Sequence, residues 1–408
     1  MSDLLKPRDA QDVTAAIQWA LGQSKTLDIV GAGSKRELGR PTQTDATLDL
    51  SGLTGVTLYE PEELVLSACA GTPLAEIEAL LASRNQELAF EPMDYGPLLG
   101  EAPGRGTIGG TLAANLAGPR RFKAGAARDH FLGVAAISGR GEAFKSGGRV
   151  VKNVTGYDLC KLLAGSWGTL AAMTDVTVKT LPRAETEATL LVAGLDDARA
   201  IEAMATALQS ACDVSGAAHL TRPVAARLPG DLGLGQAVTA MRLDGVETSV
   251  THRMAALQTL LRSWGPLLVL DARQSRTVWH AIRDATGFAA SGPAGGRIVW
   301  RISTAPAQGA RLGQQLAAKA DVELAYDWGG GLIWAALAAS EDGGAAIVRA
   351  AVAACGGHAT LVRGPAALRA RVPVFEPQAG PLAALTARVK ESFDPSRVLN
   401  PGRMWAGV

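Results

Sequence analysis

The chain is short of cysteine, of aromatic side chains and of any excess of one charge. Among its 408 residues are four cysteines, and Phe, Trp and Tyr together make up 5%. The cysteines lie far apart and form no Cys-x-x-Cys pair; they are Cys69, Cys160, Cys212 and Cys355. Such spacing supports neither a zinc ribbon nor an iron–sulfur cluster, so we expect four buried thiols.

Charge balance and hydrophobic runs exclude two further classes. Lys and Arg number 40 against 39 Asp and Glu, and without a basic excess we expect no nucleic-acid partner. The longest apolar stretch, residues 329–339, is shorter than the ~20 residues of a spanning helix, so no transmembrane segment is expected. Acidic residues and a proline occupy the N-terminus where a signal peptide has its apolar core, which predicts a cytoplasmic protein.

Glycine and apolar residues are abundant. The chain has 47 glycines, and 47% of it is hydrophobic, which predicts a folded protein of two or three domains. Residues 91–130 are rich in Gly, Pro and Arg, and we predict one short helix there, over residues 110–117. A stretch this long with so little regular structure usually holds a ligand.

The first expected unit, residues 1–182, mixes helices with strands. Apolar residues at helical spacing predict a helix that begins near Asp9, and a strand over residues 27–30 runs into a glycine turn. A second helix should begin at Pro73 with Thr72 as its N-cap. The other expected elements are strands at 47–50, 55–59, 64–70, 131–137 and 171–181, a hairpin at 139–141 and a helix at 157–163.

The second expected unit, residues 183–370, repeats one order of elements. Each half reads β-α-β-β-α-β, the split order of ferredoxin-like units, and two such halves could share one broad sheet. The predicted strands are 188–194, 214–221, 236–243, 266–270, 296–303, 321–327, 331–338 and 357–363. Residues 371–408 hold one helix, 381–392, and a tail expected to return to the first unit, so the fold class is α+β.

Two glycine-bearing turns are the candidate ligand site. Residues 104–109 satisfy G-x-G-x-x-G, but no buried strand precedes them, so we reject a Rossmann fingerprint. Residues 31–33 follow a strand, yet no helix begins there and no Walker A loop is present. Turns 31–35 and 106–110 could direct backbone N–H groups at one pyrophosphate from two sides, or they could be tight turns only.

Several motifs together resemble the PCMH-type FAD-binding fold of the vanillyl-alcohol oxidase family. They are GAGSK, GTIGGTLAANLAGPRR, VKNVTGYDL, GSWGTL and FDPSRVLNPGRM. The resemblance is greatest to the FAD-binding subunits of bacterial glycolate oxidases, and it covers residues 25–182 and 393–404. It implies FAD, which we expect to be non-covalent: the first turn has Ser34 and Lys35 in place of an attaching His or Cys, and no cysteine lies in residues 100–125.

The resemblance also implies which residues bind the cofactor. Two pyrophosphate turns, the start of the helix behind the second turn, the adenosine end, a strand-to-helix turn and the C-terminal tail would each contribute. In that order the residues are Gly31, Ala32, Gly33, Ser34 and Lys35 with Gly106, Thr107, Ile108, Gly109 and Gly110; Ala113 and Asn115; Gly168, Thr169 and Val176; Lys152; and Asn400 beside the flavin ring.

Catalytic residues are not identified by these motifs. No two of the five histidines are close in sequence, and the His-rich metal motif of related 2-hydroxy-acid dehydrogenases is absent, so no metal site is expected. His130 is the one histidine we would test. A basic group next to it could be a solvated face or a subunit contact; its members are Arg120, Arg121, Lys123 and Arg128.

For function, the resemblance implies a flavoprotein subunit of a complex that oxidises glycolate to glyoxylate. A sister FAD subunit would carry the hydroxy-acid chemistry, an iron–sulfur subunit would take the electrons, and any membrane association would be peripheral, through these partners. Two alternatives stay open. One is a self-sufficient FAD-dependent dehydrogenase for a hydroxy acid or alcohol, and the other is a non-catalytic assembly subunit with a structural FAD.

Overall fold

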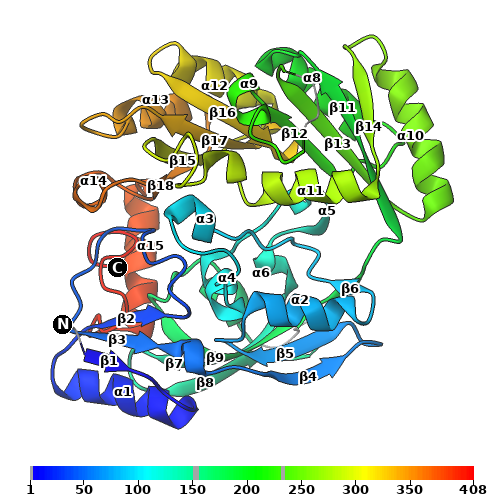
Figure 1. Cartoon of the computed structure of the whole chain (residues 1–408). Coiled ribbons are helices and arrows are strands. Elements are labelled where there is room, and N and C mark those ends of the chain that lie inside the picture. Colours follow the sequence, from blue (N-terminus) through cyan, green and yellow to red (C-terminus); the bar gives the residue numbers. More distant parts are fainter. Residues whose placement is uncertain (1–2, 150–155, 231–234) are drawn as a thin grey trace.

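The computed structural model describes residues 3–149, 156–230 and 235–408. The chain forms two lobes (Figure 1). The lower lobe holds strands β1–β10 and the C-terminal helix α15 (Gly380–Phe393), and the upper lobe holds β11–β18. The unit limits expected at residues 182 and 370 stay predictions. Within the described ranges, no helix combines the length and apolar character needed to cross a bilayer.

Two sheets build the lower lobe. The smaller is parallel, in the order β1-β3-β2, and helix α1 (Ala10–Gly22) starts at the predicted Asp9, whose side chain caps it. The larger is antiparallel, in the order β4-β5-β9-β7-β8. The strands are β1 (Asp3–Leu5), β2 (Leu27–Val30), β3 (Ala46–Asp49), β4 (Val56–Glu60), β5 (Val65–Cys69), β7 (Phe131–Ser138), β8 (Ala143–Gly147) and β9 (Ala171–Lys179), with a separate pair, β6 (Gln86–Glu87) and β10 (Leu181–Pro182).

Two expectations for this lobe were wrong. Helix α2 (Leu74–Ala82) has Pro73 as its N-cap, because the Thr72 hydroxyl is occupied elsewhere: it accepts from Gly55 N (3.0 Å) and donates to Cys69 O (2.7 Å). Residues 91–130 hold four short helices instead of one, and helices of four to seven residues show no periodic pattern to detect. They are α3 (Gly96–Leu99), α4 (Ile108–Ala114), α5 (Arg121–Ala124) and α6 (Ala127–His130), and α7 (Leu159–Leu163) follows later.

A single eight-stranded sheet forms the upper lobe, in the order β14-β11-β13-β12-β16-β17-β15-β18. Each half has the ferredoxin-like order, and the halves join where β12 pairs with β16, which confirms the predicted broad sheet. Helix α11 lies between this sheet and the lower lobe (Figure 1). The strands are β11 (Thr186–Ala193), β12 (Gly216–Leu220), β13 (Val238–Gly245), β14 (Leu267–Leu270), β15 (Ile298–Ser303), β16 (Val322–Asp327), β17 (Leu332–Leu337) and β18 (His358–Arg363). The helices are α8 (Asp197–Leu208), α9 (Arg222–Ala225), α10 (Glu247–Leu261), α11 (Ala272–Arg283), α12 (Gly309–Ala317), α13 (Ala345–Cys355) and α14 (Ala366–Arg371).

A buried ion network joins the lobes. Arg242 of β13 donates to both carboxylate oxygens of Glu91, at 2.8 and 3.1 Å. Arg120 pairs with Glu87 and, at 2.9 Å, with Asp244. Arg120 is therefore buried in this network, so the solvated face expected as one alternative was wrong for this residue, whereas the subunit contact of the basic group stays a prediction. The network fixes the upper lobe over the loops that follow β6.

The C-terminal tail is anchored by a second buried pair. Lys390 and Asp394 are fully buried, and the Lys390 Nζ donates to Asp394 Oδ2 (2.7 Å), Thr169 O (2.7 Å) and Leu399 O (3.0 Å). Asp394 in turn accepts from the backbone N–H groups of Val398 and Leu399. The tail consequently lies beside β2 in the lower lobe.

Candidate functional site

The first glycine turn begins where β2 ends. Gly33 has a φ of +75°, which a residue with a side chain rarely adopts, so the chain can turn sharply there. No backbone N–H group of Ala32, Gly33, Ser34 or Lys35 donates a hydrogen bond to any described residue. These groups lie at the wall of a cavity, so the turn presents unpaired donors to whatever fills it.

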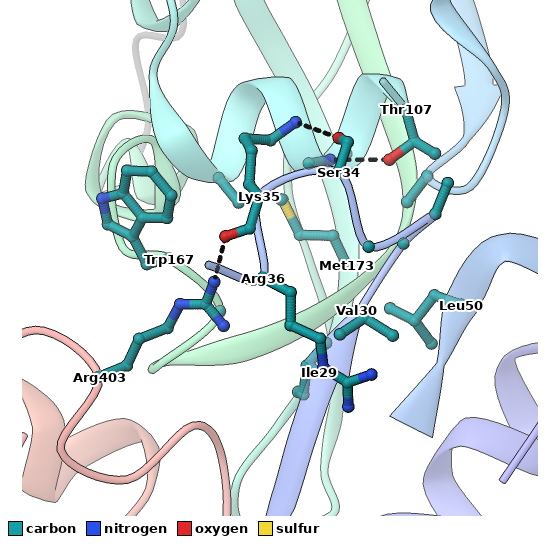
Figure 2. A pocket seen from close by; sticks show the side chains of 18 of the residues that line it. Ile29, Val30, Ser34, Lys35, Arg36, Leu50, Thr107, Trp167, Met173 and Arg403 are labelled. Atoms are coloured by element: carbon teal, nitrogen blue, oxygen red, sulfur yellow. Dashed lines mark hydrogen bonds between the residues drawn. The ribbon is translucent and has the colours of Figure 1, made fainter. Parts of the chain in front are cut away.

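The second turn lies against the first. A Cβ at Gly31 would come within 2.6 Å of the Thr107 Oγ1, and a Cβ at Gly110 within 3.6 Å of the Lys35 Cε. The two turns therefore share one cleft although they are about 75 residues apart in sequence (Figure 2).

The hydrogen bonding of the second turn differs from our expectation of free amides. Ile108 N donates to Thr72 O, Gly109 N to Ala70 O, and Gly110 N to the Thr107 hydroxyl. This turn hence contributes the Thr107 hydroxyl oxygen and the bare Cα surfaces of its glycines, whereas the first turn contributes the unpaired N–H groups. A close approach, and not an amide nest, explains the glycines: a Cβ at Gly109 would lie 2.7 Å from the Ala70 Cβ.

A half-buried lysine and a buried arginine flank the cleft. The Lys35 Nζ lies 3.2 Å from the Ser34 Oγ, and burial, with Arg403 nearby, lowers the pKa of Lys35 to about 8 although Asp94 opposes the shift. The Arg403 Nη2 donates to Lys35 O at 2.9 Å, its Nη1 lies 3.5 Å from Asp28, and its buried Nε has no partner among the described groups. Two positive groups with unused donors, one half-buried and one buried, make the cleft suited to an anion.

Asn400 connects two walls of the cleft. Its Oδ1 accepts from Ile29 N and its Nδ2 donates to Trp167 O, each at 2.8 Å. Gly168 has a φ of +72°, and a Cβ there would lie 2.8 Å from the Asn400 Nδ2. The side chain thus holds β2 and the turn at Trp167 and Gly168 together from behind, and it does not line the cavity.

Of the predicted binding residues, ten line this cavity and six described ones do not. The ten are Gly31, Ala32, Gly33, Ser34, Lys35, Thr107, Gly109, Gly110, Ala113 and Gly168; the six are Gly106, Ile108, Asn115, Thr169, Val176 and Asn400. Ile108 and Val176 are core residues, and the Thr169 hydroxyl donates to Ser166 O. Lys152 lies outside the described residues.

Two of these placements correct the sequence interpretation in detail. Ala113 lies in the last turn of α4 and Asn115 directly after its end, and neither is at the start of the helix. Asn115 adopts a φ of +50°, and its Oδ1 accepts from Arg128 N at 2.9 Å. His130 lies away from the cleft, where its Nε2 is 2.8 Å from Ala124 O.

Other lining residues were missed from the sequence: Ile29, Val30, Arg36, Leu50, Ala70, Trp167, Ala171, Met173 and Arg403. Four of them, Ile29, Val30, Ala171 and Met173, are strand residues whose inward side depends on the sheet. Trp167 and Arg403 lie inside the quoted GSWGTL and LNPGRM motifs. Their position next to glycines in these motifs is the sequence signal that could have identified them as lining residues.

A second cavity, of about 350 Å³, lies beside the first, in the space between the lobes. Trp167 lines both cavities. Ala113 and Arg403 line the first cavity, and the residues that directly follow them, Ala114 and Met404, line the second. The roof is the upper sheet, which contributes Arg301 and Ser303 of β15 and His358 and Thr360 of β18.

The residues present fit an FAD. Its diphosphate matches the unpaired amides and positive groups of the first cavity, and the second cavity, which shares Trp167 with the first, gives neighbouring room for another part of an extended dinucleotide. Bound FAD supplies the two-electron acceptor that amino-acid side chains lack.

Comparison with known proteins agrees with this geometry. A family model described as an FAD binding domain matches residues 3–147. Glycolate oxidase subunit GlcE of Escherichia coli (strain K12) is 33% identical over 400 residues, 97% of either chain. Glycolate oxidase subunit GlcD of Bacillus subtilis (strain 168) is 23% identical over 427 residues, 99% of this chain and 88% of its own.

Solved structures show the same fold. The 4-ethylphenol oxidase from Gulosibacter chungangensis superposes with a TM-score of 0.72 at 14% identity, over 99% of this chain and 89% of its own. A substrate-bound p-cresol methylhydroxylase gives a TM-score of 0.71 at 12% identity, over 98% of this chain and 88% of its own. With a full-length relative at 33% identity and an FAD binding domain in place, the chain belongs to the GlcE family of FAD-dependent oxidoreductases.

Proposed function

We propose that this chain is the FAD-binding subunit of a complex that oxidises glycolate, or a closely similar 2-hydroxy acid, to the 2-oxo acid. The proposal is supported by the full-length similarity to a glycolate oxidase subunit and by the two neighbouring cavities. In the described chain no group of three or more His, Cys, Asp or Glu side chains could hold a metal ion. We therefore assign onward electron transfer to an iron–sulfur partner and hydroxy-acid chemistry to a second FAD subunit. Any attachment to the inner face of the membrane would occur through these partners.

In this proposal each part of the first cavity has a role toward FAD. The amides of residues 32–35 donate to the diphosphate, and Lys35 and Arg403 neutralise its charge. The Thr107 hydroxyl, which already accepts from Gly110 N, can donate its proton to a phosphate oxygen. Asn400 holds β2 and the turn at Trp167 in their positions on the two walls of the cleft.

We further propose that FAD is non-covalent. The lining of the first cavity contains no cysteine or histidine, whereas His358 lines the second. Acid precipitation of the purified protein should release intact FAD. Flavin that stays with the precipitate would contradict this assignment and would make His358 the residue to examine.

The unpaired amides of the first turn, together with the buried Arg403 Nε, carry the proposal, and one substitution tests it. Gly110→Asp places a carboxylate beside Lys35, where it would compete with the diphosphate, at a position in the first turn of α4 that tolerates an acidic residue. We expect FAD affinity, measured by quenching of flavin fluorescence, to fall by about 100-fold or more, the loss expected for a buried anion meeting a fixed like charge.

Gly380→Asp is the matched control. It makes the same change at an exposed helix start where a Cβ meets nothing within 4 Å, so FAD affinity should stay unchanged. A Gly110→Asp protein that purifies with full FAD would refute the assignment of the cleft. If that variant loses FAD and the complex loses activity with its assembly intact, the flavin has a redox role; loss of assembly alone would favour the scaffold alternative.

A further inference from the structure

The second cavity has a polar patch on its roof that the proposed FAD role does not use. Arg301 is paired across the sheet with Thr360, and Ser303 with His358, so these four side chains extend from one face of β15 and β18. That face is turned toward the lower lobe, whose Tyr95 and Asn115 line the opposite side of the cavity.

Arg301 is the most notable member of the patch. Its guanidinium makes no hydrogen bond or ion pair with any residue of the described ranges. It lies over the ring of Trp328, 5.0 Å from the centroid, and Trp328 is itself fixed by a hydrogen bond from its Nε1 to Gly118 O at 2.9 Å. The guanidinium is thus held in place by stacking while its N–H groups are free for a ligand. A fixed planar fork of donors matches a carboxylate.

Nearby acidic groups do not neutralise Arg301. Burial raises the pKa of Asp327 to about 7, and its Oδ1 accepts from Trp328 N at 2.7 Å. Glu376 accepts from Arg349 and from Ala359 N. Neither carboxylate lines the cavity, so the part of Arg301 that faces the cavity is open to an anion from outside the chain.

Two further groups suit a hydroxyl next to that carboxylate. The Tyr95 hydroxyl has no partner in the described chain; burial raises the pKa of Tyr95, so the phenol keeps its proton and can donate it. Its ring is fixed edge-on against Trp334, with centroids 6.3 Å apart. His358 is exposed at the start of β18, yet partial desolvation of its ring, with Arg301 and Arg349 nearby and Glu376 opposing them, lowers the pKa of His358, so its neutral imidazole can accept a hydrogen bond at pH 7.

We propose that this chain itself binds the small 2-hydroxy acid between its lobes, with Arg301 as the carboxylate-binding, specificity-determining residue and with Tyr95 and His358 contacting the hydroxyl. The inference rests on the proposed function, because bound FAD would extend from the first cavity to the same space. It favours a substrate site in this subunit in addition to any site in a sister subunit.

The test compares a charged ligand with its neutral isostere. The full chain, loaded with FAD, is titrated with glycolate and with glycolamide, and binding is followed by flavin difference absorbance and by calorimetry. Arg301→Gln should weaken glycolate binding by about 10- to 100-fold, as expected for loss of a charged hydrogen-bonded pair, and leave glycolamide binding unchanged. Arg301→Lys should recover part of the affinity, and Arg311→Gln, on the exposed side of α12, should match the unmodified protein.

Each outcome is decisive. Equal weakening for glycolate and glycolamide, or no saturable glycolate binding to the FAD-loaded chain, would overturn the inference while leaving the FAD assignment intact. Loss of FAD from both Arg301→Gln and Arg301→Lys, with an unchanged melting temperature, would also overturn it and assign Arg301 to the flavin. If the unmodified chain cannot be loaded with FAD at all, the proposed function fails first.

Discussion

Lys35 shows at the scale of one residue how the site is prepared for its ligand. The ammonium is buried beside a second cation, so in the flavin-free protein its charged form is disfavoured and its pKa is about 8. A bound diphosphate would favour the charged form and raise that pKa again. Binding of FAD therefore takes up a proton wherever the free protein has lost it.

We expect FAD affinity to fall as the pH rises from 8 toward 10.5, by at most about tenfold per pH unit, because one proton is taken up on binding. Lys35→Met should bind FAD more weakly at pH 7 and should lose this pH dependence. The dissociation constant measured by flavin fluorescence between pH 7 and 10 gives the answer. Lys319→Met, an exposed lysine after α12, should behave like the unmodified chain; a pH dependence that persists in Lys35→Met would assign it to another group.

At the scale of elements, a buried ion pair holds α15 and the C-terminal tail against the lower lobe. Lys390 and Asp394 lie one helical turn apart and are fully buried, and each uses its remaining hydrogen-bonding capacity on backbone groups of the tail or of the lower lobe. A buried pair of this kind contributes modestly as a pair, but removing one partner leaves a charge without compensation. The buried Lys390–Asp394 pair also sets the position of Asn400, six residues after Asp394.

Asp394→Ala should lower the free energy of unfolding by roughly 3–5 kcal/mol, because Lys390 is left buried and unpaired. FAD affinity should fall as well, since Asn400 would no longer be held against Ile29 and Trp167. Denaturant unfolding and FAD titration measure the two effects. Glu391→Ala, at an exposed neighbouring position, should change the free energy of unfolding by less than about 0.5 kcal/mol. An equal effect of the two substitutions would contradict the role of the buried Lys390–Asp394 pair in holding the tail.

For the whole molecule, the interlobe network fixes the height of the second cavity. Glu91 adopts a φ of +48° and connects a lower-lobe loop with Arg242 of the upper sheet. Burial alone would raise the pKa of Glu91, but Arg242 and Arg120 hold it below its ordinary value of 4.5. The carboxylate thus stabilises the folded protein above pH 4.5, and this contribution is lost as the pH falls through the lowered pKa.

Glu91→Gln should lower the free energy of unfolding at pH 7 by roughly 3 kcal/mol, because two buried guanidinium groups lose their shared anion. The variant should also lose less stability than the unmodified protein when the pH falls below 4.5. Thermal unfolding at pH 7 and pH 4 measures both quantities. Glu341→Gln, whose side chain is 93% exposed, is the control, and a parallel acid dependence in all three proteins would contradict the assignment.

The sequence by itself determined the elements and their order. Periodicity placed α1 and each strand of the upper sheet within a few residues, and the repeated β-α-β-β-α-β order predicted the joined halves, because local spacing decides which side of an element is buried. The glycine turns and the quoted motifs likewise indicated where a cofactor would bind, since a close backbone approach demands glycine at particular positions.

Only the tertiary structure decided which groups are free. The amides of the second turn are occupied by Thr72 and Ala70, Arg120 is buried in an ion network, and Arg301 stacks on Trp328 and forms no ion pair within the described part of the chain. Each of these facts depends on partners from distant parts of the chain, and the residues adjacent in sequence do not indicate which partners those are. Hydrogen bonds and charge pairs form across space, so the chemistry of the site is fixed when the two lobes close on each other.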